Sequence, residues 1–274
     1  MSDHRIMIPQ KADFHMHTVF CDGKNTAEEM VLKGIEIGLS VIGFSVHSPL
    51  DHDKSGWCIR PDKTEAYRAE IHRLRDQYAD KIRIYCGIEQ DYFSKTSVDS
   101  YDYVIGSVHS VFKDGEYVDV DHSVETSARA ICELYDGDIY AYAEAYYALV
   151  ADVVRQTNAD IIGHFDLLTK FQDRGLAFDP ENPRYIAAWK RAADQLLQTG
   201  KPFEINTGAI SRGYRKMPYP ALDIMKYLAE HGGKAVITSD SHSTDALGTA
   251  FTLAHDLAHE AGLPLVRKIG NIEF

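Results

Sequence analysis

The sequence predicts an α/β protein whose parallel strands close into a barrel. Apolar runs of strand length alternate along the 274 residues with amphipathic runs of helix length, and this order is typical of a parallel sheet with right-handed crossovers. About seven such units occur in the chain, and this number favours a closed barrel over an open sheet. Most of the predicted strands end in a histidine or a carboxylate, and in a barrel these ends meet at one mouth.

The composition is typical of one folded globular domain. Hydrophobic residues make up 45% of the chain and charged residues 26%, so there are enough apolar side chains for a sizeable core. We therefore expect a single domain over residues 1–274, with an insertion on the loop side at around residues 111–137.

The charge of the chain excludes several classes of partner. The formal net charge is −12 and the isoelectric point is near 5.5, so the surface repels nucleic acids and anionic membranes. No run of about 18 apolar residues occurs, so no membrane span is expected. We expect a cytoplasmic protein, and an anionic substrate would need locally held cations.

The first half of the chain predicts four strands and two helices. In residues 11–18 polar and apolar side chains alternate, so His15 and His17 project from the same face of a strand. The segment Thr26-Ala27-Glu28-Glu29 is a capping-box pattern that begins a helix, and Gly38 ends it. Further strands are expected at residues 40–46, 81–88 and 101–108, and a second helix at residues 62–78.

The second half continues the alternation after an irregular stretch. Residues 111–137 are less regular, and Lys113-Asp114-Gly115-Glu116 is typical of a hairpin turn. Gly200 and Gly232 are typical of helix ends. Helices are expected at residues 139–157, 183–199, 220–231 and 244–261, and strands at residues 159–163, 201–205, 234–238 and, as a short run, 263–267.

Nine potential metal ligands lie at or just after the ends of predicted strands: His15, His17, Asp22, His47, Glu89, His109, His164, Asp240 and His242. Any one of them could be a buried structural residue, but the repetition at successive strand ends favours a metal site. Imidazoles and carboxylates without a thiolate suit two or three divalent transition metal ions of the Zn, Mn or Fe type. Such metal clusters catalyse the hydrolysis of phosphoesters. Their positive charge would also attract a small phosphorylated metabolite to the site of an otherwise acidic protein.

The remaining histidines and the cysteines are expected to be structural. Surface positions are predicted for His4, His72, His122, His231, His255 and His259, whereas the sequence leaves the role of His52 open. The four cysteines lack the spacing of a zinc site or a disulfide framework, so we expect them to be reduced. Cys21 adjoins Asp22, but it has no evident partner histidine free of metal binding, which argues against a cysteine nucleophile.

Seven short motifs carry the candidate ligands in a characteristic order. They are Asp13-Phe14-His15-Met16-His17-Thr18, Asp22-Gly23, Ser45-Val46-His47, Gly87-Ile88-Glu89, Gly106-Ser107-Val108-His109, Gly163-His164-Phe165-Asp166 and Ser239-Asp240-Ser241-His242. Over residues 10–262 the chain resembles the PHP (polymerase and histidinol phosphatase) superfamily, and more narrowly its stand-alone histidinol-phosphate phosphatases.

The resemblance implies a distorted (β/α)7 TIM-like barrel with a trinuclear metal centre. By resemblance, the first metal is held by His15, His17, Glu89 and Asp240, the second by Glu89, His109 and His164, and the third by Asp22, His47 and His242. Some members of the superfamily carry a histidine near the position of Asp22.

The resemblance also implies substrate contacts. The segment Glu204-Ile205-Asn206-Thr207-Gly208, followed by Arg212 and Arg215, resembles the substrate-recognition strand and loop of the histidinol-phosphate enzymes. We expect Glu204 to accept a hydrogen bond from the cationic end of the substrate and Arg212 to bind its phosphate. Arg60 and Arg174 are further candidates for binding phosphate, with a solvated surface arginine as the alternative.

The expected reaction is hydrolysis of L-histidinol phosphate to L-histidinol and phosphate, a step of histidine biosynthesis, without a covalent enzyme intermediate. A metal-activated hydroxide would attack phosphorus, Arg212 would complete the phosphate clamp, and Asp240 or His242 would protonate the departing alkoxide. Two alternatives remain: a PHP-type phosphoesterase for a nucleotide or another small phosphoester, and a metal-binding regulatory protein without catalysis.

Overall fold

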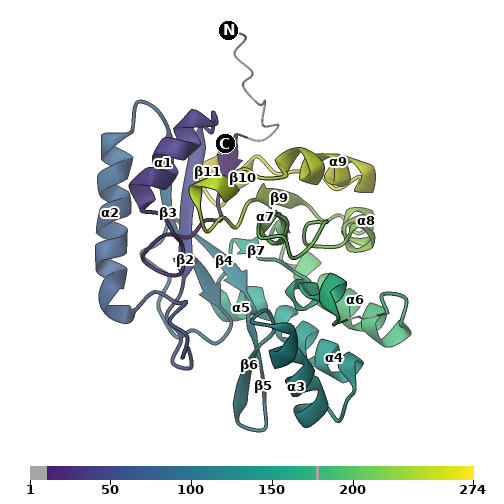
Figure 1. Cartoon of the computed structure of the whole chain (residues 1–274). Helices are drawn as coiled ribbons and strands as arrows, with labels where there is room; N and C mark the ends of the chain where they lie inside the picture. Colours follow the sequence, from purple (N-terminus) through teal and green to yellow (C-terminus); the bar gives the residue numbers. More distant parts are fainter. Residues whose placement is uncertain (1–10, 177–178) are drawn as a thin grey trace.

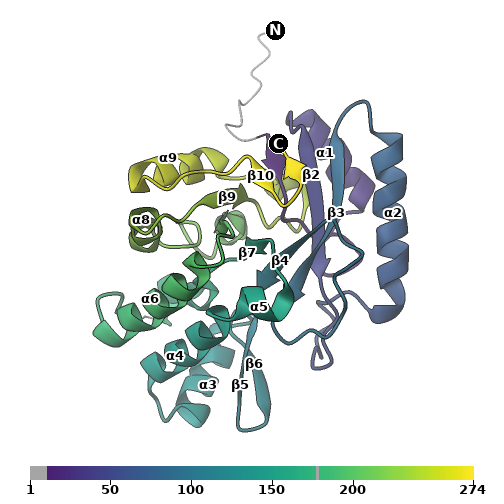
Figure 2. The ribbon, with the colours of Figure 1, turned by 180° about the vertical axis from the view of Figure 1, so that it is seen from behind.

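A parallel sheet that curls back on itself forms the centre of the molecule (Figures 1 and 2). The computed structural model describes residues 11–176 and 179–274. In this part of the chain the sheet has seven strands, all parallel, in the order β1 (Ala12–Asp13), β2 (Val41–His47), β3 (Arg83–Asp91), β4 (Tyr103–Ser107), β7 (Ile161–Ile162), β8 (Phe203–Asn206) and β9 (Ala235–Thr238).

Backbone contacts beyond the first and last strands bring the two edges of the sheet together. Met16 and Ser241 form an isolated parallel bridge, in which His17 N donates to Ser241 O at 2.8 Å and Ser241 N donates to His15 O at 3.2 Å. The sheet is therefore a nearly closed, irregular barrel, and the predicted fold class is confirmed.

Helices cover the outside of this barrel. They are α1 (Ala27–Glu36), α2 (Thr64–Gln77), α3 (Val124–Leu134), α4 (Ile139–Val150), α5 (Val153–Thr157), α6 (Pro183–Leu197), α7 (Gly208–Ser211), α8 (Leu222–Glu230) and α9 (Phe251–Ala261), with short 3-10 turns at Pro61–Lys63, Leu167–Thr169, Gln172–Arg174 and Thr244–Ala246. In Figure 1, α1 and α2 flank β2 and β3, while α6, α8 and α9 stack on the opposite side. The predicted capping box is present, because Glu29 N donates to Thr26 Oγ1 and Thr26 N donates to Glu29 Oε2.

The chain leaves the barrel between β4 and β7. It forms an antiparallel hairpin of β5 (Ser110–Lys113) and β6 (Glu116–Asp119), in which Lys113 pairs with Glu116 as the predicted turn requires. The hairpin is followed by α3, which the sequence did not predict. The interpretation of this segment as an insertion stays a prediction.

Side-chain contacts shorten the predicted first strand. Residues 11–18 were expected to form one strand, but β1 ends at Asp13 because side chains take over the backbone donors. His15 N donates to Asp13 Oδ1 at 3.3 Å, and Met16 N donates to Ser45 Oγ at 3.1 Å. This irregular stretch carries His15 and His17 to the mouth of the barrel.

Two predicted helices are also shorter than expected. The predicted helix 139–157 is divided between Val150 and Val153 into α4 and α5. The predicted helix 244–261 begins only at Phe251, because Gly248 and Ala250 adopt left-handed φ values of 70° and 59°.

The C-terminal segment differs from the prediction as well. The expected strand 263–267 is reduced to one bridge between Leu265 and Ala235. The chain then ends in a small hairpin of β10 (Lys268–Ile269) and β11 (Ile272–Glu273). Ile269 and Ile272 pack with Phe14 in the apolar cluster inside the barrel.

Tyr103 fixes the spacing of three neighbouring strands. Its ring lies where a Cβ on Gly87 would have to be, and its hydroxyl would lie 2.5 Å from a Cβ on Gly43. The same hydroxyl is within hydrogen-bond distance of Phe14 O, at 2.6 Å, and of Phe44 O, at 3.0 Å. The glycines in β2 and β3 therefore make room for a buried tyrosine that links the barrel strands.

The helices that the structure describes include none with the length and apolar character needed to cross a bilayer.

Candidate metal centre

The carboxyl ends of the parallel strands deliver all nine predicted ligands to one region. His47 ends β2 and pairs in register with Glu89 of β3. The others follow the ends of strands: His15, His17 and Asp22 after β1, His109 after β4, His164 after β7, and Asp240 and His242 after β9. Eight of these residues are buried or nearly so, and Asp22 lies closest to solvent.

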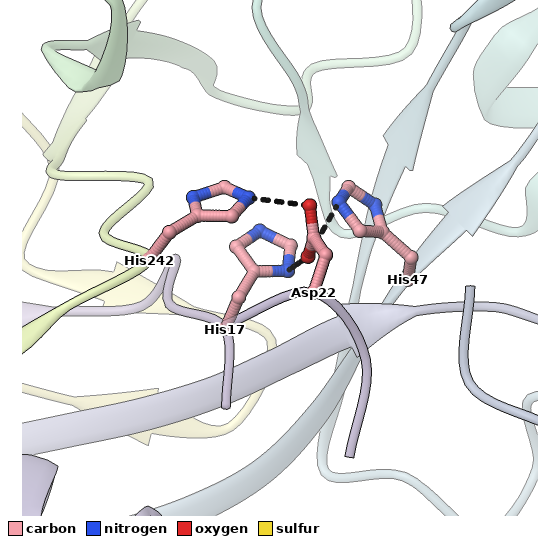
Figure 3. A group of neighbouring side chains, drawn as sticks. All are labelled: His17, Asp22, His47 and His242. Atoms are coloured by element: carbon pink, nitrogen blue, oxygen red, sulfur yellow. Dashed lines mark ion pairs between the residues drawn. The ribbon is translucent and has the colours of Figure 1, made fainter. Parts of the chain in front are cut away.

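The donor atoms in the described chain form three overlapping groups, and the atoms of each group lie within 4.8 Å of one another. The groups are His17, Asp22, His47 and His242; His15, His17 and Asp240; and His47, Glu89 and His109. Figure 3 shows the first group, in which the Asp22 carboxylate faces three imidazole rings. Its oxygens lie 3.2 Å from His242 Nε2 and 3.6 Å from His47 Nε2. Because His17 and His47 each belong to two groups, the three groups form one continuous cluster.

Glu89 lies at the centre of this cluster. Its Oε2 lies 2.7 Å from His47 Nδ1 and 3.3 Å from His15 Nε2. Its Oε1 lies 2.9 Å from His164 Nε2 and 3.3 Å from His109 Nε2. One wholly buried carboxylate thus faces imidazoles from four different strand ends, which is the arrangement expected of a bridging ligand.

Several of these atoms lack ordinary hydrogen bonds. His15 Nε2, His17 Nε2, His47 Nδ1 and Glu89 Oε2 are buried and have no hydrogen-bond partner among the described residues. Leaving a buried polar atom without a hydrogen bond lowers the stability of the fold by about 1–3 kcal/mol. Four such atoms in one cluster therefore indicate a common binding partner. A divalent cation satisfies such lone pairs, and the donor set therefore fits divalent metal ions.

The electrostatics keep the cluster carboxylates ionised. Burial raises the pKa of Glu89, but the imidazoles of His15, His47 and His109 outweigh it and hold the pKa well below its ordinary value. Burial likewise opposes ionisation of Asp240, and Arg212 together with His15 lowers its pKa well below the usual range. An ionised Asp240 does not donate a proton to an alkoxide, so this electrostatic environment favours His242 of the two predicted acids, and the assignment stays a prediction.

Two carboxylates orient imidazoles from behind the cluster. Glu204 Oε1 lies 2.5 Å from His15 Nδ1, and Asp91 Oδ2 lies 3.1 Å from His109 Nδ1. Each contact leaves the Nε2 atom of the same ring directed at the cluster, and such contacts set the ring orientation and basicity of metal ligands. Asp91 was not among the predicted site residues, although its position two residues after Glu89 in β3 places both on one face of the strand.

The structure places Glu204 and Asn206, two of the predicted substrate contacts, outside the described lining of the cavity above the cluster. Glu204 is wholly buried, and besides His15 it accepts from His164 N at 2.8 Å and from Thr238 Oγ1 at 2.6 Å. Asn206 Nδ2 lies 3.0 Å from Glu204 Oε2 and 3.2 Å from Asp240 Oδ2. Both side chains therefore lie beneath the cluster and support its ligands.

A cavity of ≈ 260 Å³ opens above the cluster. Arg212 lines it, and its guanidinium lies 3.1 Å from Asp240 Oδ2 and 2.7 Å from His242 Nδ1. Because a guanidinium only donates, His242 Nδ1 accepts in this contact. The Nε of Arg212 is buried without a hydrogen-bond partner in the described chain, so this arginine retains a donor. The remaining wall includes Trp57, Asp119, Asp121, Lys170 and Tyr214.

The other predicted phosphate contacts lie away from the described lining of this cavity. Arg60 is exposed and its Nε lies 3.0 Å from Asp62 Oδ1. Arg174 donates to Gly213 O at 2.6 Å. Arg215 is largely buried and donates to Thr169 Oγ1 at 2.7 Å. The structure thus brings only Arg212 of the four candidate arginines to the cluster.

The remaining histidines and Cys21 mostly follow the expectations. His72, His122, His231 and His259 are exposed, His255 is half-buried, and His4 lies outside the described residues. His122 also borders the cavity, and His52 stacks on Tyr117 at 3.9 Å. Cys21 Sγ lies 3.5 Å from His17 Nδ1, and burial raises the pKa of its thiol to about 12, which disfavours a nucleophilic thiolate.

Sequence comparisons match this chain to one family of known proteins. The model of the PHP domain family matches residues 13–208. A Deinococcus radiodurans protein named probable histidinol-phosphatase is 29% identical over 87% of this chain and 89% of its own length. The histidinol-phosphatase of Bacillus subtilis is 25% identical over 88% of this chain and 97% of its own length.

Solved structures share the fold. A Lactococcus lactis histidinol phosphate phosphatase, crystallised with zinc, L-histidinol and phosphate, matches with a TM-score of 0.69 and 20% identity over 95% of this chain and 97% of that chain. A Listeria monocytogenes structure matches with a TM-score of 0.78 and 22% identity over 89% of this chain and 99% of that chain.

Proposed function

This chain belongs to the PHP domain family, and from that premise we propose that it is a metal-dependent phosphomonoesterase that hydrolyses L-histidinol phosphate to L-histidinol and phosphate. The observation that carries the proposal is the convergence of buried imidazoles from four strand ends on Glu89, beneath a cavity lined by Arg212. The names of the curated relatives, which match over most of their length, support the substrate.

We assign two or three divalent transition metal ions of the Zn, Mn or Fe type to the cluster. His15, His17, Glu89 and Asp240 would hold the first, Glu89, His109 and His164 the second, and Asp22, His47 and His242 the third. Bound ions of this kind lower the pKa of water and neutralise phosphate oxygens.

The side chains around the cluster have separate tasks. Arg212, held by Asp240 on one side, directs its guanidinium into the cavity and would bind the phosphate by charge-assisted hydrogen bonds. Glu204 and Asp91 fix the ring orientation of His15 and His109. His242, at the cavity wall, would protonate the departing alkoxide only in a centre that lacks the third ion, because its Nδ1 accepts from Arg212 and its Nε2 would otherwise bind that ion.

A panel of phosphomonoesters tests the function. Protein freed of metal by a chelator and reloaded with Mn²⁺ or Zn²⁺ should hydrolyse histidinol phosphate with a higher kcat/KM than nucleoside monophosphates, sugar phosphates or p-nitrophenyl phosphate. The chelated protein should be inactive, and elemental analysis should find two to three ions in the active protein. A preference for a nucleotide would assign another substrate, and inactivity with every ester and metal would indicate a regulatory protein.

A further inference from the structure

The hairpin of β5 and β6 brings an acidic side chain to the cavity wall, where the sequence analysis expected none. We infer that Asp119 recognises the cationic amine of the substrate, so that the enzyme selects phosphate esters of amino alcohols. This inference rests on the proposed function and names the residue that determines specificity. It also replaces Glu204, which the structure places beneath the cluster.

Backbone and side-chain contacts fix Asp119 beside a candidate metal ligand. Ser110, the residue after His109, pairs in register with Asp119 across the hairpin. Ser110 Oγ donates to Asp119 Oδ1 at 2.6 Å. Val120 N donates to His109 O at 2.8 Å. The carboxylate is therefore held in a defined position next to His109.

The alternation of side chains along β6 directs Asp119 to the cavity. Val118 and Val120 are buried in the large apolar cluster of the molecule. Asp119, the last residue of β6, lies on the face of the strand opposite to Val118. Asp119 and Asp121, which lies in the turn after β6, both line the cavity that Arg212 and the cluster share. The hairpin and the turn after it thus deliver carboxylates to the wall of the cavity that would hold the reacting phosphate.

The charges of this wall leave Asp119 available. Asp121 Oδ2 pairs with Lys170 Nζ at 3.0 Å, and Arg212 pairs with Asp240. Asp119 has no ion pair with a described side chain, and the neutral hydroxyl of Ser110 donates a hydrogen bond to its carboxylate. The nearby His52 lies 3.5 Å from that same hydroxyl and stacks on Tyr117. A half-buried carboxylate without a cation is a strong acceptor for an ammonium group.

The chemistry of the substrate matches this arrangement. In histidinol phosphate the ammonium-bearing carbon is bonded to the carbon that carries the phosphate ester, so a small cavity must accept both charges. Arg212 and the cluster serve the anionic end, and Asp119 serves the cationic end within the same ≈ 260 Å³. Trp57, whose ring packs edge-on against His47 and His109, supplies an apolar surface in the wall of the same cavity.

Substrate selectivity of Asp119→Asn tests the inference. Asparagine keeps the shape and still accepts the Ser110 hydrogen bond, but it loses the charge. The ratio of kcat/KM for histidinol phosphate to that for p-nitrophenyl phosphate should fall roughly ten- to a hundredfold, the range for a lost charge-assisted hydrogen bond. Calorimetric titration of the metal-loaded protein should show weaker binding of L-histidinol, whereas binding of inorganic phosphate should change much less.

Asp114→Asn is the matched control. Asp114 lies at the exposed tip of the same hairpin with φ 51°, a conformation that asparagine adopts readily. This variant should keep the wild-type ratio. If the wild-type protein shows no preference for histidinol phosphate, the proposed function and this inference both fall. If the preference exists and Asp119→Asn retains it together with wild-type histidinol binding, the inference alone is overturned.

Discussion

Glu204 Oε1 lies 2.5 Å from His15 Nδ1, and both side chains are wholly buried. The other oxygen of the same carboxylate accepts a hydrogen bond from the backbone of His164. The carboxylate of Glu204 in β8 therefore positions residues from two other strand ends. Glu204 itself is not part of the described lining of the cavity. A carboxylate is also suited to bind the cationic end of a substrate, but Glu204 is buried too deeply to contact one.

Glu204→Gln should weaken turnover of every phosphomonoester by the same factor. The amide cannot polarise His15 as a carboxylate does, and losing such a support typically costs about 10–100-fold in metal affinity or activity. We expect kcat/KM for histidinol phosphate and for p-nitrophenyl phosphate to fall together, and elemental analysis to find less bound metal.

Glu133→Gln serves as the control for this change. Glu133 is exposed on α3 and makes an ion pair with Arg129, so its loss should leave turnover and metal content unchanged. A selective loss of histidinol phosphate turnover in Glu204→Gln, with full metal content, would instead support the substrate role that the sequence predicted for Glu204.

Alanine substitutions should separate the cluster histidines from the surface histidines. His17 belongs to two donor groups and Asp240 to one of them, so His17→Ala or Asp240→Ala should lower turnover by orders of magnitude through a missing or misplaced ion. His72 is exposed on α2, and His72→Ala should leave turnover nearly unchanged. Equal losses in steady-state assays of the two kinds of variant would contradict this division of the histidines.

The fold and the ligand set could be predicted because they depend on local periodicity. An apolar run that ends in His47 or Glu89 identifies both a parallel strand and the end that faces the mouth of a barrel. How deeply a side chain lies within the barrel, in contrast, leaves no pattern in the sequence. Glu204 and Asp240 are both acidic residues near strand ends, yet Asp240 borders the cavity whereas Glu204 lies beneath it, because Glu204 lies within β8, level with Val236, and Asp240 follows the end of β9.

The positions of the hairpin side chains could not be predicted for a different reason. Asp119 is ten residues beyond His109, and it returns to the mouth only because Ser110 pairs with it across the turn. The turn itself was recognisable at Asp114 and Gly115, but the orientation of the hairpin depends on packing of Val118 and Val120 against the large apolar cluster. Contacts between segments of this kind leave no pattern in either segment alone.

A stability prediction follows from the packing of Tyr103. In Gly87→Ala the new methyl group would overlap the Tyr103 ring, which is buried and hydrogen-bonded to the backbone of neighbouring strands. Overpacking of this kind costs about 1–3 kcal/mol, so chemical denaturation should show a lower free energy of unfolding.

Gly34→Ala provides the comparison for that measurement. Gly34 lies in α1, and a Cβ there would meet the flexible ends of Ile42 and Ile82 at 3.3 Å and 3.4 Å. Because alanine also favours the helix by roughly 1 kcal/mol over glycine, this variant should unfold at a similar or higher denaturant concentration than the wild type. Equal destabilisation of both variants would show that Tyr103 adapts as easily as the ends of isoleucine side chains.

Arg212→Ala should weaken turnover of all phosphomonoesters, because the phosphate is the group that they share. Loss of a charge-assisted hydrogen bond costs about 1.5–3 kcal/mol, which corresponds to roughly ten- to a hundredfold in kcat/KM. Inhibition by inorganic phosphate should weaken in the same proportion, and Arg212→Lys should recover part of both effects because it keeps the charge without the bidentate geometry. Arg60→Ala, which removes an exposed arginine paired with Asp62, should change neither measurement.

The metal content of Arg212→Ala decides between two roles for this side chain. Arg212 also contacts Asp240 and His242, so its removal could act through the candidate ligands. If it binds phosphate, the variant should retain wild-type metal content while its phosphate inhibition constant rises. If metal content falls and added Mn²⁺ or Zn²⁺ restores turnover, Arg212 orients ligands instead, and the phosphate must be held by the metal ions and other groups of the cavity wall.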